Sequence, residues 1–367
     1  MPNAKEVPPC GHSATVAARV VTCRDTDPVQ TATCAASGAG NMFVVGRGCV
    51  WQSLQMQATY VDVNPGTGPG TYPGRHGLTR ACELAMVRAM FDLDAYFDRI
   101  RYAGPRSATR ATLDGIVHAH VQAIPFENID VLLGRGIVLD LDAIADKLVT
   151  RRRGGYCFEQ NTLLLRVLTE LGFDAHAISA RVRIQRPRDF TPPRTHVFVH
   201  VVIDGAPWLA DVGVGGLSPT AALRLVLDEE QTTPHETRRL IADGDWSGFG
   251  LRAPSARLFH QAKLGDVWAD VCEFTLEPMA EIDRELGNWF TSTHPRSHFR
   301  DRLMAARATD DGRLTLLDRE VTRRTAHGTT STTIETPQAL LAVLAADFGL
   351  VLPPETRFPH LEAQWSR

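Results

Sequence analysis

The sequence has almost no lysine, no long hydrophobic run and no large excess of either charge sign. Lysine occurs at only three of 367 positions, so arginine carries nearly all of the positive charge, and the formal net charge is −3. This balance argues against the basic surface of a nucleic-acid-binding protein. The chain also shows no acidic tail. The dominance of arginine gives some weight to anionic ligands, because the guanidinium group suits them.

Membrane and secretion signals are also missing. No stretch approaches the length of a transmembrane helix, and residues 1–21 lack the charged and apolar regions of a signal peptide. We therefore expect a soluble cytoplasmic protein without a membrane partner, either a monomer or a weak homo-oligomer. In that compartment thiols stay reduced, so structural disulfides are not expected.

The cysteines show no pattern of metal binding. They form no C-x-x-C pair and have no accompanying histidine cluster, so we predict no metal site. Five of the seven lie in the first 90 residues: Cys10, Cys23, Cys34, Cys49 and Cys82. The remaining two are Cys157 and Cys272.

Residues 1–88 differ from the rest of the chain. They are poor in charge and include VNPGTGPGTYPGRHG, which can form neither a helix nor a central strand. One interpretation is that the segment is a disordered extension. We favour a second, in which the start of the gene is mis-annotated and the protein begins at Met86 or Met90. A targeting or regulatory arm is the third possibility.

After residue 88 the hydrophobic residues first recur at the spacing of a helix and later alternate as in a strand. Four segments predict helices: FDLDAYFDRIRYAG, ending at Gly104, SATRATLDGIVHAHVQAI, LDAIADKLVTRRR, and residues 158–171 before Gly172. Strand-like segments such as AHAISARVRI and THVFVHVVIDG follow, and PQALLAVLAADFG predicts a closing helix. The order favours the α+β class. We predict a helical domain (89–171), a sheet or barrel domain (172–285) and a smaller α/β domain (286–367).

The stretch RRRGGYCFEQN places Cys157 where the chain enters a helix. A helix N-terminus and nearby cations stabilise a thiolate and so lower the pKa of a cysteine. Gly154 and Gly155 allow positive φ and a close approach by a substrate or cofactor. These features indicate a reactive thiol, although a cysteine at a helix start is often inert.

A predicted hairpin supplies two partners for this thiol. Asp204 and Gly205 are typical of a two-residue loop, in which residues whose numbers sum to 409 lie opposite each other. Asp211 then faces Phe198, and His196 is a diagonal neighbour at roughly 7–8 Å between backbones. A Cys157–His196–Asp211 triad for acyl transfer follows, with His200 as the alternative base on the same face.

Several separate motifs resemble the arylamine N-acetyltransferase family. They are RGGYCFEQN, PFENIDVLLGR, THVFVHVVIDG, LADVGVGG and STHPRSHF, in this order between about Phe91 and Pro354. The family has a cysteine followed by a histidine and an aspartate, and here the intervals are 39 and 15 residues. The resemblance leaves residues 1–88 outside.

The resemblance implies a papain-like cysteine acyltransferase with a helical domain, a β-barrel domain and an α/β lid. It implies that acetyl-CoA, a co-substrate rather than a permanently bound cofactor, acetylates Cys157. An arylamine, arylhydrazine or N-hydroxyarylamine then attacks the thioester in a ping-pong reaction. His196 would act as base and acid, and Asp211 would orient it.

The same matching implies binding residues. Phe126, Val214 and Phe290 would line the acceptor pocket, and Gly213, Gly215 and Gly216 would lie next to the CoA pyrophosphate. Val214 departs from the phenylalanine common in the family, which removes an aromatic surface from the pocket wall. Two structural roles are also predicted: an ion pair between Glu127 and Arg153, and backbone contacts by Asn128 and Asn161.

Other functions share this triad. An amide synthase that releases a polyketide chain as a macrolactam would change the acyl donor, and Val214 could suit a larger acyl group. A cysteine peptidase or transglutaminase-type hydrolase is less favoured, because the RGG entry and the glycine loop argue against it. A sensor or scaffold without catalysis is disfavoured, since no triad residue is missing.

Overall fold

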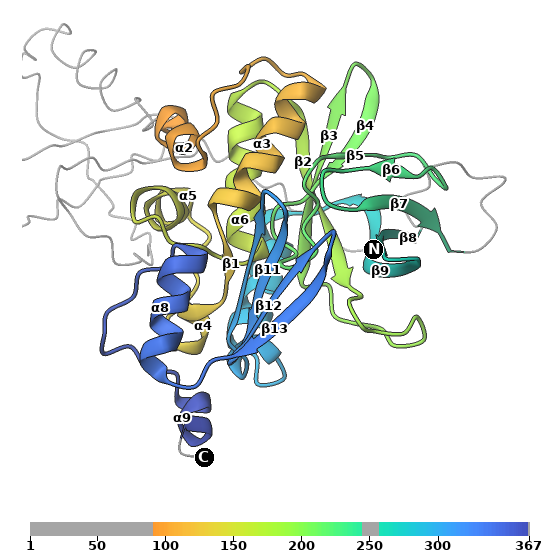
Figure 1. Ribbon diagram of the computed structural model, residues 1–367. Coiled ribbons are helices and arrows are strands. Elements are labelled where there is room, and N and C mark those ends of the chain that lie inside the picture. The colour runs from red at the N-terminus through yellow and green to blue at the C-terminus, as the bar shows by residue number, and fades with distance from the viewer. Residues whose placement is uncertain (1–90, 244–256, 366–367) are drawn as a thin grey trace, which may run out of the picture. The chain divides into compact units, whose positions relative to one another are not determined.

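The computed structural model describes residues 91–243 and 257–365. The interpretation of residues 1–88 therefore lies outside the described residues. The fold combines helices with two antiparallel sheets (Figure 1), which confirms the α+β class. Residues 91–367 form one compact unit, and the division at residues 171 and 285 stays a prediction. No helix of the described residues is long and apolar enough to cross a membrane.

The segment up to residue 171 is largely helical, as predicted. It contains α2 (Leu93–Ile100), α3 (Arg110–Ala123), α4 (Ile129–Leu132), α5 (Leu141–Ala145) and α6 (Cys157–Glu170). Helix α2 ends before the predicted Gly104, because Arg101 adopts a left-handed conformation with φ of 57°. The third predicted helix is also shorter, since α5 passes into a π-helical turn, Asp146–Thr150.

The larger sheet has eight antiparallel strands in the order β5-β4-β3-β2-β9-β8-β7-β6. They are β2 (Asp174–Val182), β3 (His196–Ile203), β4 (Ala206–Ala210), β5 (Leu223–Arg224), β6 (Gln231–Thr232), β7 (Thr237–Ala242), β8 (Leu258–Leu264) and β9 (Val267–Pro278). The edge strands β5 and β6 are bridged by the Gln231 side chain. Its amide accepts from the Arg224 N–H at 2.7 Å and donates to the Arg224 carbonyl at 2.9 Å. The sheet thus comes close to a closed barrel.

The predicted hairpin between β3 and β4 is confirmed. Asp204 and Gly205 both have positive φ, 51° and 75°, as a two-residue turn of this kind requires. Val199 pairs with Ala210, so the register is the one predicted. This register fixes which side chains of β3 approach the residues that follow β4.

The second sheet joins the helical segment to the end of the chain. Its order is β1 (Phe126–Glu127), β10 (Met304–Thr309), β11 (Gly312–Leu317), β12 (Glu320–Thr325) and β13 (Gly328–Thr333). Helix α8 (Pro337–Phe348) packs on it through Leu340, Leu344 and Phe348, and α9 (Pro359–Trp365) follows. Helix α7 (Glu281–Thr293), which our sequence analysis missed, links the two sheets together with the short helix η2 (His298–Arg300).

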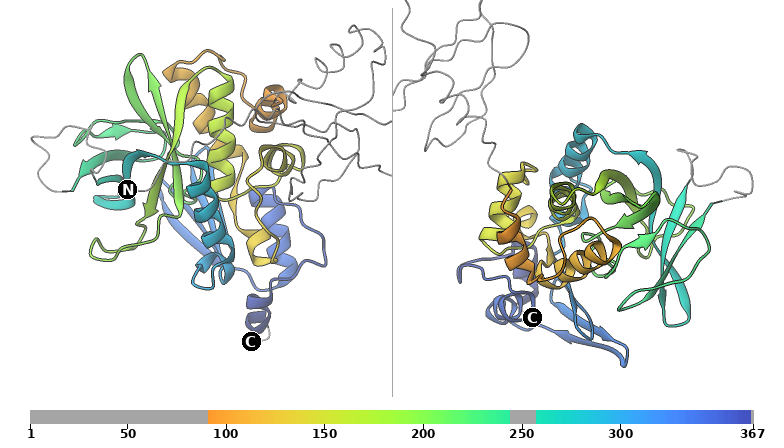
Figure 2. Two further views of the ribbon diagram at one scale, coloured as in Figure 1. Left: turned by 180° about the vertical axis from the view of Figure 1, so that it is seen from behind. Right: turned by 90° about the horizontal axis from the view of Figure 1, so that it is seen from above.

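Helices α3 and α6 cover one face of the larger sheet (Figures 1 and 2). Their apolar residues pack against Val199 and Val201 of β3 in one continuous core. From behind, α7 runs beside the ends of β2 and β3 (Figure 2, left). The first turn of α6 is thereby held between β3 and α7, and this is where Cys157 lies.

Candidate active site

Two glycines, Gly154 and Gly155, precede Cys157 at a point where the chain is closely packed. A Cβ atom on Gly154 would lie 2.2 Å from the Pro125 carbonyl oxygen, and one on Gly155 would lie 2.8 Å from Glu159. Neither glycine has a positive φ. The expectation that they admit a substrate or cofactor was therefore wrong. Gly154 is required because the Pro125 carbonyl passes against it, and Gly155 is required because the Glu159 side chain of α6 does.

Cys157 is the first residue of α6 and is only 3 % exposed. Its thiol donates a hydrogen bond to the Thr195 carbonyl oxygen at 3.4 Å. Burial raises the pKa of the Cys157 thiol, the charges of Asp211 and Glu159 add to this, and the Phe158 N–H only partly opposes it. The expected lowering of the pKa was wrong, because desolvation outweighs the N–H groups at the helix terminus.

Two of the three arginines before Cys157 form ion pairs with carboxylates of the helical segment. Arg153 forms an ion pair with Glu127 at 2.7 Å, which confirms the predicted structural clamp. Arg151 pairs with Asp146 at 2.7 Å, and both side chains are more than half exposed. The Arg152 carbonyl accepts a hydrogen bond from Arg99. Arg151 and Arg153 are thus paired within the helical segment, and a base for Cys157 is found on another element.

His196 and Asp211 form a buried pair next to this thiol. Nε2 of His196 lies 2.9 Å from Oδ2 of Asp211, and the side chains are 1 % and 0 % exposed. Burial opposes ionisation of Asp211, but His196, Asn161 and the Gly213 N–H together hold the pKa of this carboxyl below its usual value. A bond from Nε2 leaves Nδ1 as the ring nitrogen that can accept a proton.

Asn161 ties the helix to the hairpin, one turn beyond Cys157. Its Nδ2 donates to Asp211 Oδ1 and to the Val197 carbonyl oxygen, both at 2.8 Å, and its Oδ1 accepts from the Val212 N–H at 3.0 Å. The predicted backbone role of Asn161 is confirmed, whereas its bond to Asp211 was missed. The i, i+4 spacing from Cys157 could have indicated it, because such residues share a helix face.

Asn128 also satisfies backbone groups, as predicted. It donates to the carbonyl oxygens of Phe299 and Arg302 and accepts from the Met304 N–H. These bonds attach the segment after β1 to the entry of β10.

His200, the alternative base, lies on β3 but is not brought to Asp211. Its ring contacts that of His176 in β2 in a tilted arrangement, with centroids 4.6 Å apart. Burial and the neighbouring His176 lower the pKa of His200 to about 4. The geometry therefore pairs His196, and not His200, with the carboxylate.

The glycine segment after Asp211 packs tightly within the protein. The Gly213 N–H donates to Asp211 Oδ1 at 2.8 Å, and the Gly215 N–H donates to Ser218 Oγ at 3.1 Å. Gly215 has φ of 87°, and a Cβ there would lie 3.4 Å from the Phe126 ring. A Cβ on Gly216 would lie 2.7 Å from the Thr315 side chain. Two of the amides predicted to face a pyrophosphate are thus already used inside the chain.

Gly213→Ala tests how closely this segment must approach the nucleophile. The added Cβ would lie 2.7 Å from the Cα of Cys157 and 2.8 Å from Nδ2 of Asn161, so the backbone of α6 or the loop must shift. We expect kcat/KM to fall by about 10²-fold, since a misplacement of about 1 Å has this cost. Steady-state kinetics with a melting curve checks it, with Gly136→Ala between α4 and α5 as the control, because nothing lies within 4 Å of a Cβ there and Gly136 has no positive φ.

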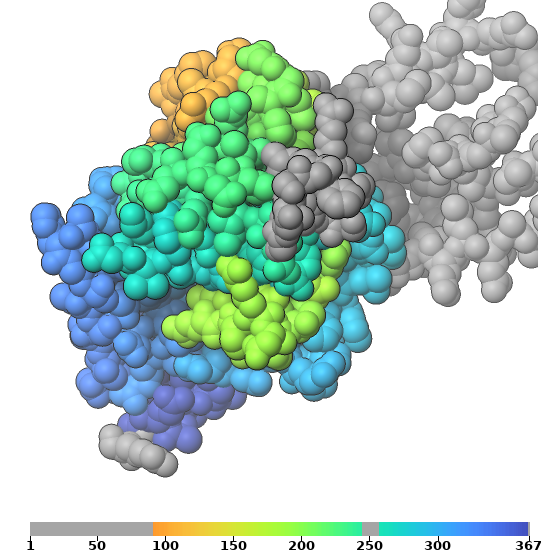
Figure 3. Space-filling view, turned by 90° about the vertical axis from the view of Figure 1, so that its right-hand side faces the viewer, coloured from red at the N-terminus to blue at the C-terminus, as the bar shows by residue number. Residues whose placement is uncertain are grey.

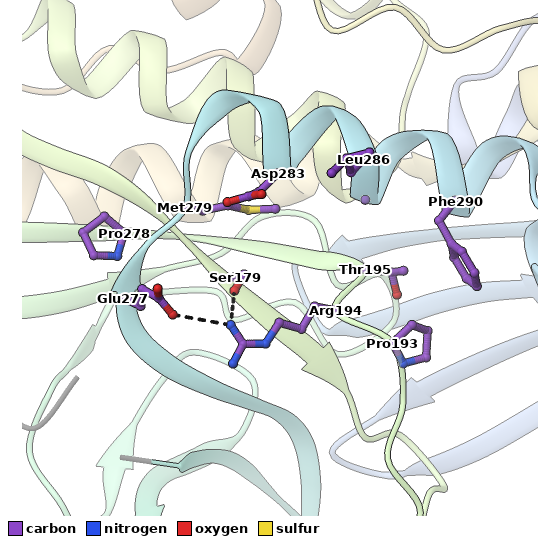
Figure 4. Close-up of a pocket in the computed structure, with 11 residues that line it drawn as sticks. Ser179, Pro193, Arg194, Thr195, Glu277, Pro278, Met279, Asp283, Leu286 and Phe290 are labelled. Atoms are coloured by element: carbon purple, nitrogen blue, oxygen red, sulfur yellow. Dashed lines mark hydrogen bonds and ion pairs between the residues drawn. The ribbon is translucent and has the colours of Figure 1, made fainter. Parts of the chain in front are cut away.

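One pocket of about 440 Å³ opens next to the histidine strand (Figure 4). Phe290, Leu286 and Asp283 of α7 form one side of it, and Arg194 and Thr195 form the other. Of the three predicted acceptor residues, Phe290 lines this pocket. Phe126 packs with Tyr156 and Phe158, and Val214 packs with Phe198 and Leu217 in the core of the larger sheet.

Comparisons with known proteins identify the family of the chain. Residues 109–357 match a family model described as N-acetyltransferase. The arylamine N-acetyltransferase of Mycobacterium tuberculosis is 41 % identical over 263 residues, 71 % of this chain and 89 % of the relative. That of Escherichia coli is 39 % identical over 261 residues, 70 % of this chain and 88 % of the relative.

Solved structures show the same likeness. The Mycobacterium marinum arylamine N-acetyltransferase in complex with CoA matches with a TM-score of 0.68 and 40 % identity, covering 75 % of this chain and 98 % of that one. The Salmonella typhimurium enzyme matches with a TM-score of 0.66 and 35 % identity, covering 75 % of this chain and 97 % of its own. The chain therefore belongs to the arylamine N-acetyltransferase family and is an acetyl-transferring enzyme.

Proposed function

We propose that the chain transfers an acetyl group from acetyl-CoA, through a thioester on Cys157, to arylamines, arylhydrazines or N-hydroxyarylamines. The observation that carries this proposal is the buried His196–Asp211 pair, whose neighbour Thr195 holds the Cys157 thiol. The CoA complex of the M. marinum relative supports a CoA-derived donor. A Salmonella relative is named an N-hydroxyarylamine O-acetyltransferase as well, which supports the range of acceptors.

The first half-reaction acetylates the enzyme. His196 Nδ1 accepts the thiol proton, and the Cys157 sulfur attacks the thioester carbonyl carbon. The tetrahedral intermediate collapses when the bond to the CoA sulfur breaks, and the imidazolium returns its proton to that sulfur. Because burial and the Asp211 charge disfavour a lone thiolate at Cys157, proton transfer to His196 and attack are coupled steps.

The second half-reaction deacetylates the enzyme. The acceptor nitrogen, or the hydroxyl oxygen of an N-hydroxyarylamine, attacks the acetyl carbon while His196 accepts its proton. The bond to the Cys157 sulfur then breaks, and the proton passes back to the sulfur. The amide or ester leaves, and the thiol is restored for another cycle.

We also propose a papain-like layout with three domains at the predicted boundaries. In it, the helical domain carries the nucleophile, the barrel domain carries His196 and Asp211, and the last domain forms a lid. The bonds from Asn161 of α6 to Asp211 and Val197 support this arrangement, since they join the two sides of the site.

Mass spectrometry of the intact protein tests the proposed function. After brief incubation with acetyl-CoA we expect the mass of one added acetyl group, which disappears when an arylamine is added and appears as the amide. Cys157→Ala should form no adduct and lose at least about 10³-fold in turnover. Cys272→Ala should form the adduct normally, because this second buried free cysteine lies in β9, outside the site.

Two results would contradict the proposal. One is the absence of an adduct on the unaltered chain. The other is loss of the adduct at the same rate with and without amine, which would indicate a hydrolase instead.

A further inference from the structure

The pocket of about 440 Å³ is lined by residues that contact the start of α6 from two elements. Thr195, whose carbonyl oxygen accepts the Cys157 thiol at 3.4 Å, lines it directly before β3. Gly287 lines it from α7, and a Cβ at this glycine would lie 2.6 Å from the ring of Phe158, the residue after Cys157. An acceptor that approaches the acetyl group on Cys157 through this pocket would direct its amine toward Thr195.

The walls of this pocket suit an aromatic ring. Leu286 and Phe290 of α7 line one side, together with Met279 before the helix, and Pro193 lies on the other side (Figure 4). In the space-filling view, the segment between β2 and β3, which contains Pro193, stands at the surface beside α7 (Figure 3). Aromatic rings pack favourably on such apolar and aromatic side chains, so an arylamine fits this cavity.

The charges in the pocket do not cancel. Among the residues that the structure describes, Arg194, Glu277 and Asp283 are the charged ones that line it. Arg194 and Glu277 lie 3.8 Å apart and offset each other (Figure 4). Asp283 forms no hydrogen bond or ion pair with any part of the chain that the structure describes. Its carboxylate therefore leaves one uncompensated negative charge in the pocket.

Other charged residues of α7 do not compensate Asp283. Arg284, the next residue, lies 3.7 Å from Glu281 on the same helix and does not line the pocket. Glu285 is a further carboxylate of this helix and also lies outside the pocket. Asp283 belongs to the first turn of α7, where a helix N-terminus favours carboxylates, so a role in helix stability alone is the alternative that a test must separate.

Asp283 and Phe290 are separated by a distance that one ligand can span. They are seven residues apart in α7, so they share a face of the helix and lie roughly 10 Å apart along its axis at about 1.5 Å per residue. A molecule whose ring packs on Phe290 therefore places a substituent of that ring near Asp283. The attacking amine must be uncharged to act as a nucleophile, so a cation that meets Asp283 belongs to this substituent.

We propose that Asp283 is a specificity-determining residue that favours arylamine acceptors with a positively charged substituent on the side of the ring away from the amine. This inference rests on the proposed function and adds the charge class of the acceptor to it. The uncompensated carboxylate attracts such a cation and repels an acceptor with a carboxylate substituent.

The test compares two acceptors that differ only in charge, (4-aminobenzyl)trimethylammonium and 4-neopentylaniline. Their ratio of kcat/KM reports the second half-reaction and cancels changes that affect both alike. In Asp283→Asn we expect this ratio, cation over neutral, to fall about threefold, the size of an ion pair that stays exposed to solvent. Asp283→Lys replaces attraction by repulsion, so the ratio should fall about tenfold, and kcat/KM for 4-aminobenzoate should rise.

Glu285→Gln is the matched control. It removes the same charge from the same helix at a position outside the pocket, so the ratio should stay unchanged. An unchanged ratio in Asp283→Asn, with a lower melting temperature, would show that Asp283 serves only the start of α7 and would overturn the inference. An equal fall in the Asp283 and Glu285 variants would assign the preference to the overall charge of the helix and overturn it too.

Failure of this inference is distinguishable from failure of the proposed function. Acetylation of Cys157 by acetyl-CoA is measured by mass without any acceptor, so it does not depend on Asp283. Normal acetylation with an unchanged ratio removes only the role of Asp283, whereas lack of acetylation removes the function itself.

Discussion

Asp211→Asn is expected to lower kcat/KM by about 10³–10⁴-fold while the chain remains folded. The Asp211 carboxylate accepts from His196 on Oδ2 and from Asn161 and Gly213 on Oδ1. An asparagine at position 211 can still accept from Asn161 and the Gly213 N–H through its side-chain oxygen. Its NH₂ group would then face His196 Nε2 and donate to it, which places the imidazole proton on Nδ1. This tautomer cannot accept the proton of Cys157.

Acetylation of the enzyme and steady-state turnover measure this effect. The first half-reaction should slow as much as the whole reaction, because the proton transfer from Cys157 precedes it. Asp204→Asn is the matched control, since it makes the same substitution in the turn of the same hairpin, where asparagine also tolerates positive φ. Full activity in the Asp211 variant would show that orientation of His196 by a carboxylate is not needed.

Turn-forming residues in the local sequence allowed us to predict the β3–β4 hairpin and the pairing of His196 with Asp211. Asp204 and Gly205 set the register by their backbone preferences alone, and the register sets the neighbours of Asp211. Helix α8 was equally predictable, because Thr336 caps its start and Gly349, with φ of 69°, ends it.

Long-range contacts explain what could not be predicted. Gly287 interrupts the helical pattern of α7, and a Cβ there would lie 2.6 Å from the Phe158 ring, so the glycine is set by packing. Strand β1 pairs with β10, far along the chain, through Phe126 with Ala306 and Glu127 with Ala305. The pKa of Cys157 likewise depends on its burial, which could not be predicted from the neighbouring residues in the sequence.

A buried ion network supports the start of α6 and carries the second large effect that we expect. Nζ of Lys147 lies 2.8 Å from Asp130 and 2.8 Å from Glu159. Glu159 also accepts the Tyr156 N–H at 3.1 Å and so caps the helix that begins with Cys157. Burial raises the pKa of Glu159, and Lys147 opposes this rise. The lysine thus favours the charged form of a buried carboxylate.

Lys147→Met should lower the free energy of unfolding at pH 7 by about 3–5 kcal/mol, because it leaves the buried Glu159 carboxylate without its ion-pair partner and removes one of the cations beside Asp130. Lys263→Met is the control: this lysine is 37 % exposed, its carboxylate partner is 3.8 Å away, and we expect a loss below about 1 kcal/mol. Adding Glu159→Gln to Lys147→Met should recover part of the loss, because a neutral amide can still accept the Tyr156 N–H. Urea unfolding curves of the four proteins measure these differences.

The pH dependence of this loss is a further check. Burial opposes ionisation of Asp130, but Lys147 and Arg153 lower the pKa of its carboxyl to about 2. A lowered pKa contributes stability above the unfolded value of about 4, and this contribution is lost as the pH falls toward 2. The difference between the unaltered chain and Lys147→Met should therefore be largest near neutral pH and shrink below about pH 4. A difference that does not change with pH would assign the loss to packing of the lysine stem rather than to its charge.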